Sequence, residues 1–175
     1  MWSSRIGALR WRAQSQQDRL AYSFLQDEGR EELKLTYAEL DRRARAIGAM
    51  LQERRAAKQR VLLIYPPGLD YIAGFFGCLY AGAVAVPVYP PRDKGNLQRL
   101  WSIARDAQAT LALVGGGVLS RIKPAILSES PLSAMQWLNT DGVDAGPEND
   151  WRHPDFKGDA LAFLQYTSGS TGKPK

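Results

Sequence analysis

The chain has 175 residues, of which 45% are hydrophobic and 23% are charged. This composition is typical of one globular domain, or of part of a larger one, and excludes disordered and fibrous proteins. The net charge of +5 allows anionic ligands without requiring nucleic acid, and no nucleic-acid recognition motif accompanies it. A single cysteine and a single histidine exclude a disulfide scaffold and a zinc fold of the usual Cys and His type.

The N-terminal twelve residues do not form a secretory signal, because Arg5, Arg10 and Arg12 interrupt their apolar residues. We therefore expect a cytoplasmic protein. Beyond them, the apolar segments 21–25 and 33–35 flank the polar Asp-Glu-Gly-Arg of residues 27–30. This pattern predicts two short strands joined as a hairpin.

A capping box begins the first predicted helix, which we place at about residues 37–57. Thr36 and Glu39 have the capping-box spacing, and Leu35 is placed to pack on Leu40 as a hydrophobic staple. Apolar residues recur on one face of this helix: Leu40, Ala44, Ile47 and Leu51. The other face is predicted to be solvated, and its charged residues are Asp41, Arg42, Arg43, Arg45, Glu53, Arg54 and Arg55.

Residues 71–91 carry no charge and are nominally long enough to span a bilayer. A buried helix, turn and strand is the favoured interpretation, because Gly82 ends the helical half and Pro87 and Pro90 close the strand. Strands are predicted at 61–65, 83–88 and 111–114, with helices at 70–80 and around Leu97 to Ala104 between them. This alternation predicts an α/β fold with a parallel sheet flanked by helices, whose ligands bind at the carboxyl edge.

Three further segments have two possible interpretations each. The run Gly115–Gly117 could be a phosphate loop, but a plain turn is favoured, followed by a helix at 118–127 that Pro124 is expected to kink or end. Strand-end packing is favoured over an acyl channel for Tyr65, Pro66 and Pro67. Residues 139–158 are rich in Asp, Gly and Pro and are predicted to form a surface loop.

The most informative segment is a predicted strand at 160–166 that opens into Thr-Ser-Gly-Ser-Thr-Gly-Lys-Pro-Lys at residues 167–175. Glycines allow a tight turn with inward amides, hydroxyls add hydrogen-bond donors, and lysines supply positive charge, a combination suited to a polyphosphate. The P-loop signature of NTPases has a longer spacing, so this is not a Walker A loop. A flexible Ser/Gly tail explains neither the preceding strand nor the lysines.

Residues 166–175 resemble the phosphate-binding signature of the adenylate-forming superfamily of acyl and aryl CoA ligases, peptide-synthetase adenylation domains and luciferases. Two weaker landmarks of that superfamily are matched at 35–40 and 79–87, and the likeness covers about residues 9–175. The segment Val-Pro-Val-Tyr-Pro-Pro-Arg at 86–92 resembles fatty-acyl-AMP ligases in particular.

The resemblance implies a reaction in two steps. A fatty-acid carboxylate attacks the α-phosphate of Mg-ATP, giving acyl-AMP and pyrophosphate, and a thiol of an acyl carrier protein of a polyketide or peptide synthase then accepts the acyl group. It also assigns the phosphate loop to Thr167, Ser168, Gly169, Ser170, Thr171, Gly172 and Lys173, and Lys175 falls at the second lysine position of the family. No metal ligand is assigned to this chain, and Mg2+ is expected with ATP.

Members of the superfamily are much longer than this chain. Residues 1–175 are therefore expected to be the N-terminal part of an adenylation domain, inactive and poorly soluble alone, with the catalytic lysine in a C-terminal domain that is absent. The alternatives are part of a fatty-acyl-CoA ligase, or a noncatalytic module that binds a nucleotide or a partner. A docking role would depend on the arginine-rich face between Arg42 and Arg55 and would not depend on Lys173.

Overall fold

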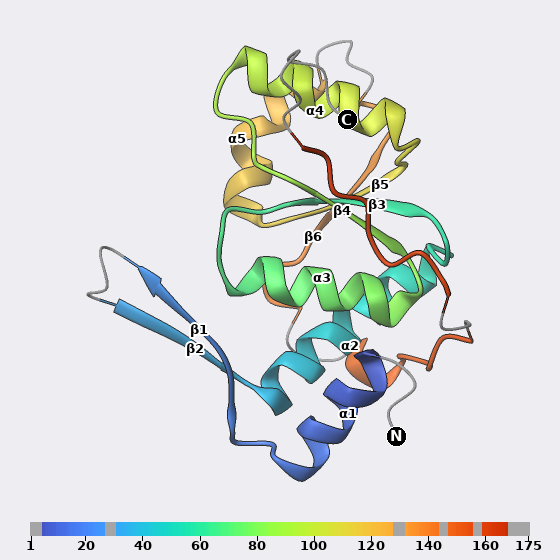
Figure 1. Cartoon of the computed structure of the whole chain (residues 1–175). Helices are drawn as coiled ribbons and strands as arrows, with labels where there is room; N and C mark the ends of the chain where they lie inside the picture. Colours follow the sequence, from blue (N-terminus) through green and yellow to red (C-terminus); the bar gives the residue numbers. More distant parts are fainter. Residues whose placement is uncertain (1–4, 27–30, 128–131, 144–146, 156–158, 168–175) are drawn as a thin grey trace.

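The computed structural model describes residues 5–26, 31–127, 132–143, 147–155 and 159–167, and these form an α/β fold of three layers. A sheet lies in the middle, with α2 and α3 on one side and α4 and α5 on the other (Figure 1). Helix α1 (Arg5–Ser15) packs on α2 (Tyr37–Glu53) outside this sandwich. The predicted fold class is confirmed.

The predicted hairpin is confirmed by β1 (Leu20–Gln26) and β2 (Glu31–Thr36), which pair antiparallel and project away from the three layers (Figure 1). The predicted capping box follows, since the backbone N–H and the hydroxyl of Thr36 both donate to Glu39. Leu35 and Leu40 are buried in one cluster, as the staple requires. Helix α2 ends at Glu53, four residues before its predicted end, because Arg55 takes a positive φ of 54°.

The central sheet is parallel and has the order β4-β3-β5-β6. Its strands and the helices between them run in the sequence β3 (Arg60–Ile64), α3 (Leu69–Ala81), β4 (Val84–Val88), α4 (Lys94–Asp106), β5 (Leu111–Val114), α5 (Gly116–Leu127) and β6 (Gln136–Asn139). The chain passes from β3 to β4 on one side of β3. It later adds β5 and then β6 on the other side of β3. The carboxyl edge at this reversal is where ligands of open α/β sheets bind.

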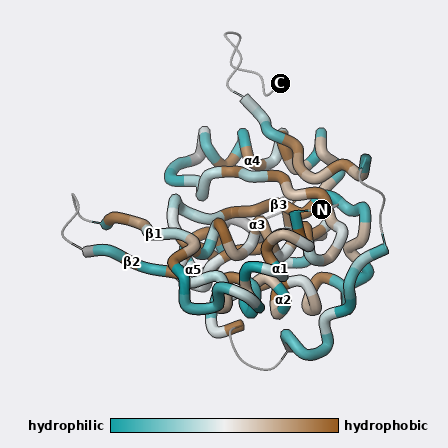
Figure 2. Tube along the Cα trace, turned by 60° about the horizontal axis from the view of Figure 1, so that its bottom comes forward, coloured by the Kyte–Doolittle hydropathy of each residue, from teal (hydrophilic) through white to brown (hydrophobic). Residues whose placement is uncertain are grey.

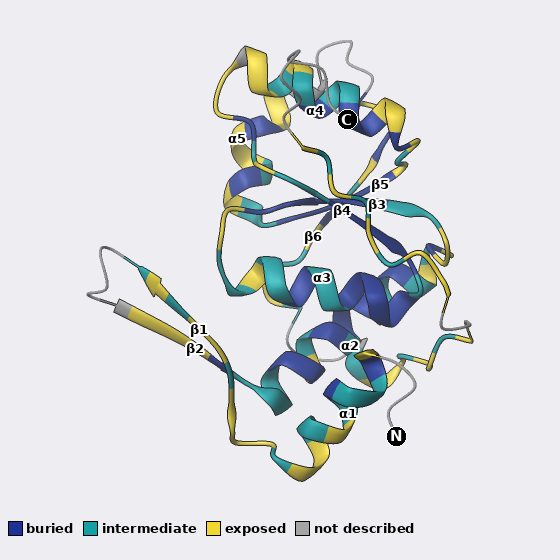
Figure 3. Cartoon of the chain, in the orientation of Figure 1, coloured by how far each residue is buried: buried dark blue, intermediate teal, exposed yellow. Residues whose placement is uncertain are grey.

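Two apolar cores fill the spaces between the layers. Strands β3, β4 and β5 are fully buried apart from their ends, and they alternate between the two cores, so that Leu63 faces α2 and α3 while Leu62 and Ile64 face α4 and α5 (Figure 3). The tube is correspondingly brown along β3 (Figure 2). Of the helices in the described ranges, none has the length and apolar character needed to cross a membrane. Residues 71–91 thus form the predicted buried helix, turn and strand.

The helix predicted at 118–127 is confirmed as α5, which begins at Gly116 and continues past Pro124 to Leu127. Two other predictions about the second half of the chain need correction. Residues 139–158 are not simply a surface loop, because β6 ends at Asn139 and the short 3-10 helix η2 (Pro147–Asn149) packs on α2. Residues 160–166 form a single parallel bridge, Phe163 to Ala85, instead of a strand.

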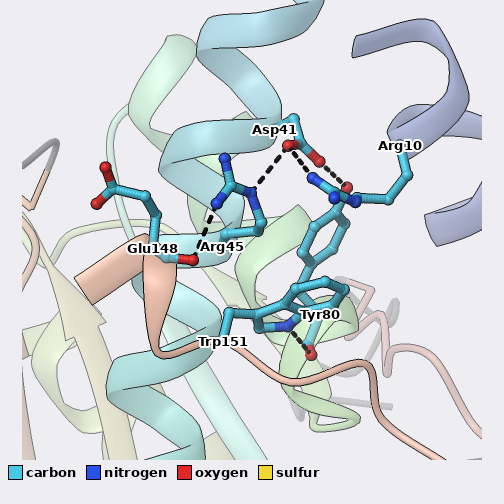
Figure 4. A network of polar contacts seen from close by, with 6 residues as sticks. All are labelled: Arg10, Asp41, Arg45, Tyr80, Glu148 and Trp151. Atoms are coloured by element: carbon cyan, nitrogen blue, oxygen red, sulfur yellow. Dashed lines mark hydrogen bonds and ion pairs between the residues drawn. The ribbon is translucent and has the colours of Figure 1, made fainter. Parts of the chain in front are cut away.

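The solvated face predicted for α2 is also partly wrong, because Asp41 is only 3% exposed. Its carboxylate accepts hydrogen bonds from Arg10 at 2.6 Å, Arg45 at 3.0 Å and the hydroxyl of Tyr80 at 2.7 Å (Figure 4). Arg45 also donates to the backbone carbonyl of Glu148. A buried carboxylate requires such partners, and here they join α1, α2, α3 and η2.

Candidate functional site

A cavity of about 330 Å³ opens at the carboxyl ends of β3 and β4, beside α4. Most of its lining is apolar or aromatic. The lining residues are Tyr65, Pro66, Pro67, Tyr71, Pro87, Val88, Tyr89, Asn96, Arg99, Leu100, Ile103, Gln165 and Tyr166. Tyr65, Pro66 and Pro67 therefore take part in a cavity, which strand-end packing alone does not explain.

The inner wall of this cavity is rigid around Tyr65. The hydroxyl of Tyr65 shares a hydrogen bond of 2.8 Å with Thr140, just beyond β6. A Cβ atom at Gly74 would lie 2.9 Å from the Tyr65 ring, so this glycine lets the ring lie against α3. Burial raises the pKa of Tyr65, so its hydroxyl stays protonated beyond the pH at which an exposed tyrosine ionises.

Helix α4 supplies the polar part of the lining. Asp93 caps this helix by accepting from the backbone N–H of Asn96 at 2.8 Å, which places Asn96 and Arg99 on successive turns beside the cavity. Arg99 is half-buried and has no hydrogen bond or ion pair with any residue in the described ranges. An uncompensated guanidinium beside an apolar cavity favours a ligand that has an anionic group and an apolar group.

The chain enters the predicted phosphate signature from the wall of this same cavity. Gln165 and Tyr166 line it, and Thr167, the first residue of the predicted phosphate loop, follows in an exposed position. The hydroxyl of Tyr166 donates to the carboxylate of Asp106 at the end of α4. The remaining predicted loop residues, Ser168, Gly169, Ser170, Thr171, Gly172 and Lys173, lie outside the described residues, as does Lys175.

The alternative phosphate loop at Gly115–Gly117 is occupied by a carboxylate of the chain itself. The backbone N–H of Gly116, at the start of α5, donates to Asp141 at 2.8 Å. A Cβ atom at Gly116 would lie 2.5 Å from the same carboxylate oxygen. Asp141 therefore already provides the anion that this helix N-terminus attracts. The favoured interpretation of a plain turn needs correction, because Gly116 and Gly117 are the first residues of α5.

Sequence reasoning missed several lining residues of the cavity. Tyr71 lies in the first turn of α3 and Arg99 lies on α4, and neither residue was given a role from the sequence. The available signal was their place in the fold, since each follows a strand at the carboxyl edge where parallel sheets bind ligands.

Comparison with known proteins identifies one family. A family model described as AMP-binding enzyme matches residues 9–175. The medium-chain fatty acid–acyl-carrier-protein ligase JamA of Moorena producens is 43% identical over 178 residues, which cover 99% of this chain and 30% of that ligase. A long-chain fatty acid–AMP ligase of Mycobacterium marinum is 32% identical, over 90% of this chain and 25% of its own length.

A solved structure agrees with these relatives. The fatty acyl-adenylate ligase of L. pneumophila, in complex with acyl adenylate and pyrophosphate, superposes with a TM-score of 0.88 and 33% identity. The alignment covers 99% of this chain and 29% of that ligase. The chain thus spans about 30% of the length of the first relatives that it matches.

Proposed function

Because the chain belongs to the AMP-binding enzyme family, we propose that it forms the N-terminal part of an adenylation domain that activates a fatty acid with ATP. The observation that supports this most directly is that the cavity and the assigned phosphate loop are continuous along the chain. The cavity has an apolar lining suited to an acyl chain, and the chain passes from its wall at Gln165 and Tyr166 directly into the assigned phosphate loop, which begins at Thr167. Carboxylate and polyphosphate would therefore meet at one edge of the sheet.

In the proposed reaction the fatty-acid carboxylate attacks the α-phosphate of ATP, and pyrophosphate leaves. The repulsion between these anions is the physical obstacle, and the amides, hydroxyls and lysine of residues 167–173 would offset it by holding the β- and γ-phosphates. Arg99 would add a cation at the border between the apolar cavity and the nucleotide. A cytoplasmic location, with its supply of ATP, belongs to the same proposal.

How Mg2+ would be held depends on which metal-ligating side chains lie together in the described ranges. Among those residues no three His, Cys, Asp or Glu side chains gather where a metal ion could be held. Mg2+ is commonly bound through substrate phosphates and water with few protein carboxylates. We propose that Mg2+ would be held through the phosphates of ATP, and no residue in the described ranges is given a role as its ligand.

The nucleotide part of this proposal is tested by calorimetric titration of the purified chain with Mg-ATP. Lys173→Ala should weaken binding by about tenfold, the loss expected for one charge-assisted contact to phosphate. Lys58→Ala is the matched control, because Lys58 is exposed in the turn after α2. Equal affinities for the wild type and Lys173→Ala would contradict the assigned phosphate loop.

The acyl part is tested with a medium-chain fatty acid. Val88→Phe adds a ring inside the cavity and should weaken fatty-acid binding while leaving ATP binding unchanged. Val143→Phe, at a half-buried valine beside the smaller cavity near α2 and α3, is the control. If both variants weaken fatty-acid binding equally, the acyl chain does not occupy the cavity beside α4.

The proposed acceptor is the thiol of an acyl carrier protein, with a polyketide or peptide synthase as the proposed source of that carrier. JamA supports this choice, since its name specifies a carrier-protein acceptor. A chimera in which this chain replaces the matching 30% of JamA tests the point in a full-length enzyme. Acyl transfer to the carrier and not to coenzyme A is expected, and the reverse preference would favour an acyl-CoA ligase. The isolated chain is expected to form no acyl-AMP.

A further inference from the structure

The segment that leads into the phosphate signature is held to the sheet at one point only. The backbone N–H of Ala85 donates to Ala162 at 3.0 Å, and the N–H of Leu164 donates to Ala85 at 2.9 Å. Successive side chains at this bridge pack in different places. The ring of Phe163 meets the ring of Phe75 on α3, and Leu164 packs towards α4. The dark-red ribbon of this segment passes the sheet edge and rises towards α4 (Figure 1).

Pro87 explains why the pairing stops there. In a parallel ladder the backbone groups of alternate residues face the same neighbour, so residue 87 is the next after Ala85 to face this segment. Proline has no N–H and cannot donate to the carbonyl of Leu164. The last residues before the signature are consequently without backbone pairing to β4.

The contact between Tyr166 and Asp106 comes at the point where this pairing is lost. The ring of Tyr166 packs against the apolar core beside α4, and its hydroxyl donates to the Asp106 carboxylate. Asp106 is the last residue of α4, where a negative charge opposes the helix dipole. Helix stability therefore does not account for an aspartate at this position, whereas the hydrogen bond does.

We propose that Asp106 is a positioning residue, which acts through Tyr166 to fix the place where the phosphate signature begins. This inference rests on the proposed function, because it assumes that residues 167–173 bind ATP. The Asp106 carboxylate holds the Tyr166 hydroxyl in place, and the packed Tyr166 ring in turn holds the backbone of residue 166. Thr167 follows, and it supplies the first hydrogen-bond donor of the phosphate loop. Asp106 itself does not touch the nucleotide in this proposal.

The test combines Mg-ATP affinity with hydrogen–deuterium exchange on the full chain. Asp106→Ala and Tyr166→Phe should each weaken ATP binding roughly threefold to tenfold, the loss expected for one hydrogen bond. The double variant should be no weaker than either single variant, because both remove the same contact. Exchange should rise at the amides from Leu164 onward and stay unchanged in β3 and β5. Asp106→Glu, which keeps the carboxylate, should recover part of the affinity.

Two matched controls separate this role from a general effect of charge or of a lost hydroxyl. Asp18→Ala removes an exposed carboxylate in the turn after α1, and Tyr22→Phe removes the hydroxyl of a tyrosine that is 39% exposed on the hairpin. Neither should change ATP affinity. A wild-type chain that binds no ATP would overturn the proposed function and this inference together. Normal ATP binding by Asp106→Ala, or additive losses in the double variant, would overturn this inference alone.

Discussion

Trp151 donates its indole N–H to the backbone carbonyl of Tyr80 at 2.8 Å, across 71 residues of chain. The two rings lie 5.0 Å apart between centroids, and the Gln52 side chain donates to the neighbouring Arg152 carbonyl at 2.6 Å. Residues 151 and 152 are therefore attached to the α2 and α3 pair before the chain reaches the edge of β4. This attachment is part of what delivers the chain to the candidate site.

Replacing Trp151 with Phe should lower the free energy of unfolding by about 1–2 kcal/mol, because the hydrogen bond to Tyr80 is lost and the ring becomes smaller. Urea denaturation followed by circular dichroism measures this change. Trp101→Phe is the control, since the Trp101 indole nitrogen is buried and has no hydrogen-bond partner among the described residues. A loss at Trp101 as large as that at Trp151 would show that ring size alone matters.

Asp41→Ala should cost about 2–4 kcal/mol of stability, because it leaves Arg10, Arg45 and the Tyr80 hydroxyl without their shared acceptor. Glu53→Ala provides the comparison, since the Glu53 side chain is 77% exposed and pairs with Arg54 at the surface. That variant should change stability by less than about 0.5 kcal/mol. Chemical denaturation of both variants measures these changes in the free energy of unfolding. Equal changes would mean that the buried contacts of Asp41 contribute no more stability than the exposed pair of Glu53.

Gly77→Ala should destabilise the α2 and α3 pair by about 1–3 kcal/mol. A Cβ atom at this position would lie 2.4 Å from the Ile47 Cγ2 atom, so the two helices would have to move apart. Gly117→Ala, near the start of α5, meets nothing within 4 Å and should be neutral or slightly stabilising. Thermal melts of the two variants provide the measurement. An unchanged melting temperature for Gly77→Ala would show that α2 and α3 tolerate a wider separation.

The capping box gives the stability a defined pH dependence. The Thr36 backbone N–H bonds to Glu39 and lowers the pKa of this carboxyl below 4.5, with a further contribution from the Thr36 hydroxyl. A lowered pKa in the folded state means that the stabilisation is fully present above pH about 4.5 and is lost as the pH falls through the folded pKa.

Urea midpoints of wild type and Glu39→Gln should therefore differ most above that pH and converge in more acidic solution. Glu53→Gln, which alters an exposed pair at the other end of α2, provides the reference. A difference for Glu39→Gln that stays constant through the acid range would argue against a role for the ionised carboxylate.

Local patterns predicted much of this fold, since the hairpin, the Thr36 cap and the strands at 61–65 and 111–114 all depend on short-range spacing. Strand β6 was missed because only Leu138 of its four residues is buried, which leaves no periodicity to detect. Burial of Asp41 was missed because Arg10 and Tyr80 lie 31 and 39 residues away in the sequence.

The residue types of the candidate site were predictable from the sequence, but the contacts that surround them in the fold were not. The signature at 166–175 was evident from residue types alone, and the carboxyl edge of the sheet followed from the alternation of strands and helices. The segment before the signature alternates like a strand, yet whether it pairs depends on Pro87 of another strand. The place of Arg99 beside the cavity likewise depends on how α4 lies on the sheet.

Cys78, the only thiol of the chain, is fully buried between α3 and the sheet, and burial raises its pKa. A thiol reacts as its thiolate and only when a reagent can reach it, so alkylation has to wait until this layer opens. The rate of modification by a maleimide therefore reports how often α3 separates from the sheet, with no engineered probe. A reactive cysteine introduced on the exposed hairpin could be labelled selectively while Cys78 remains in place.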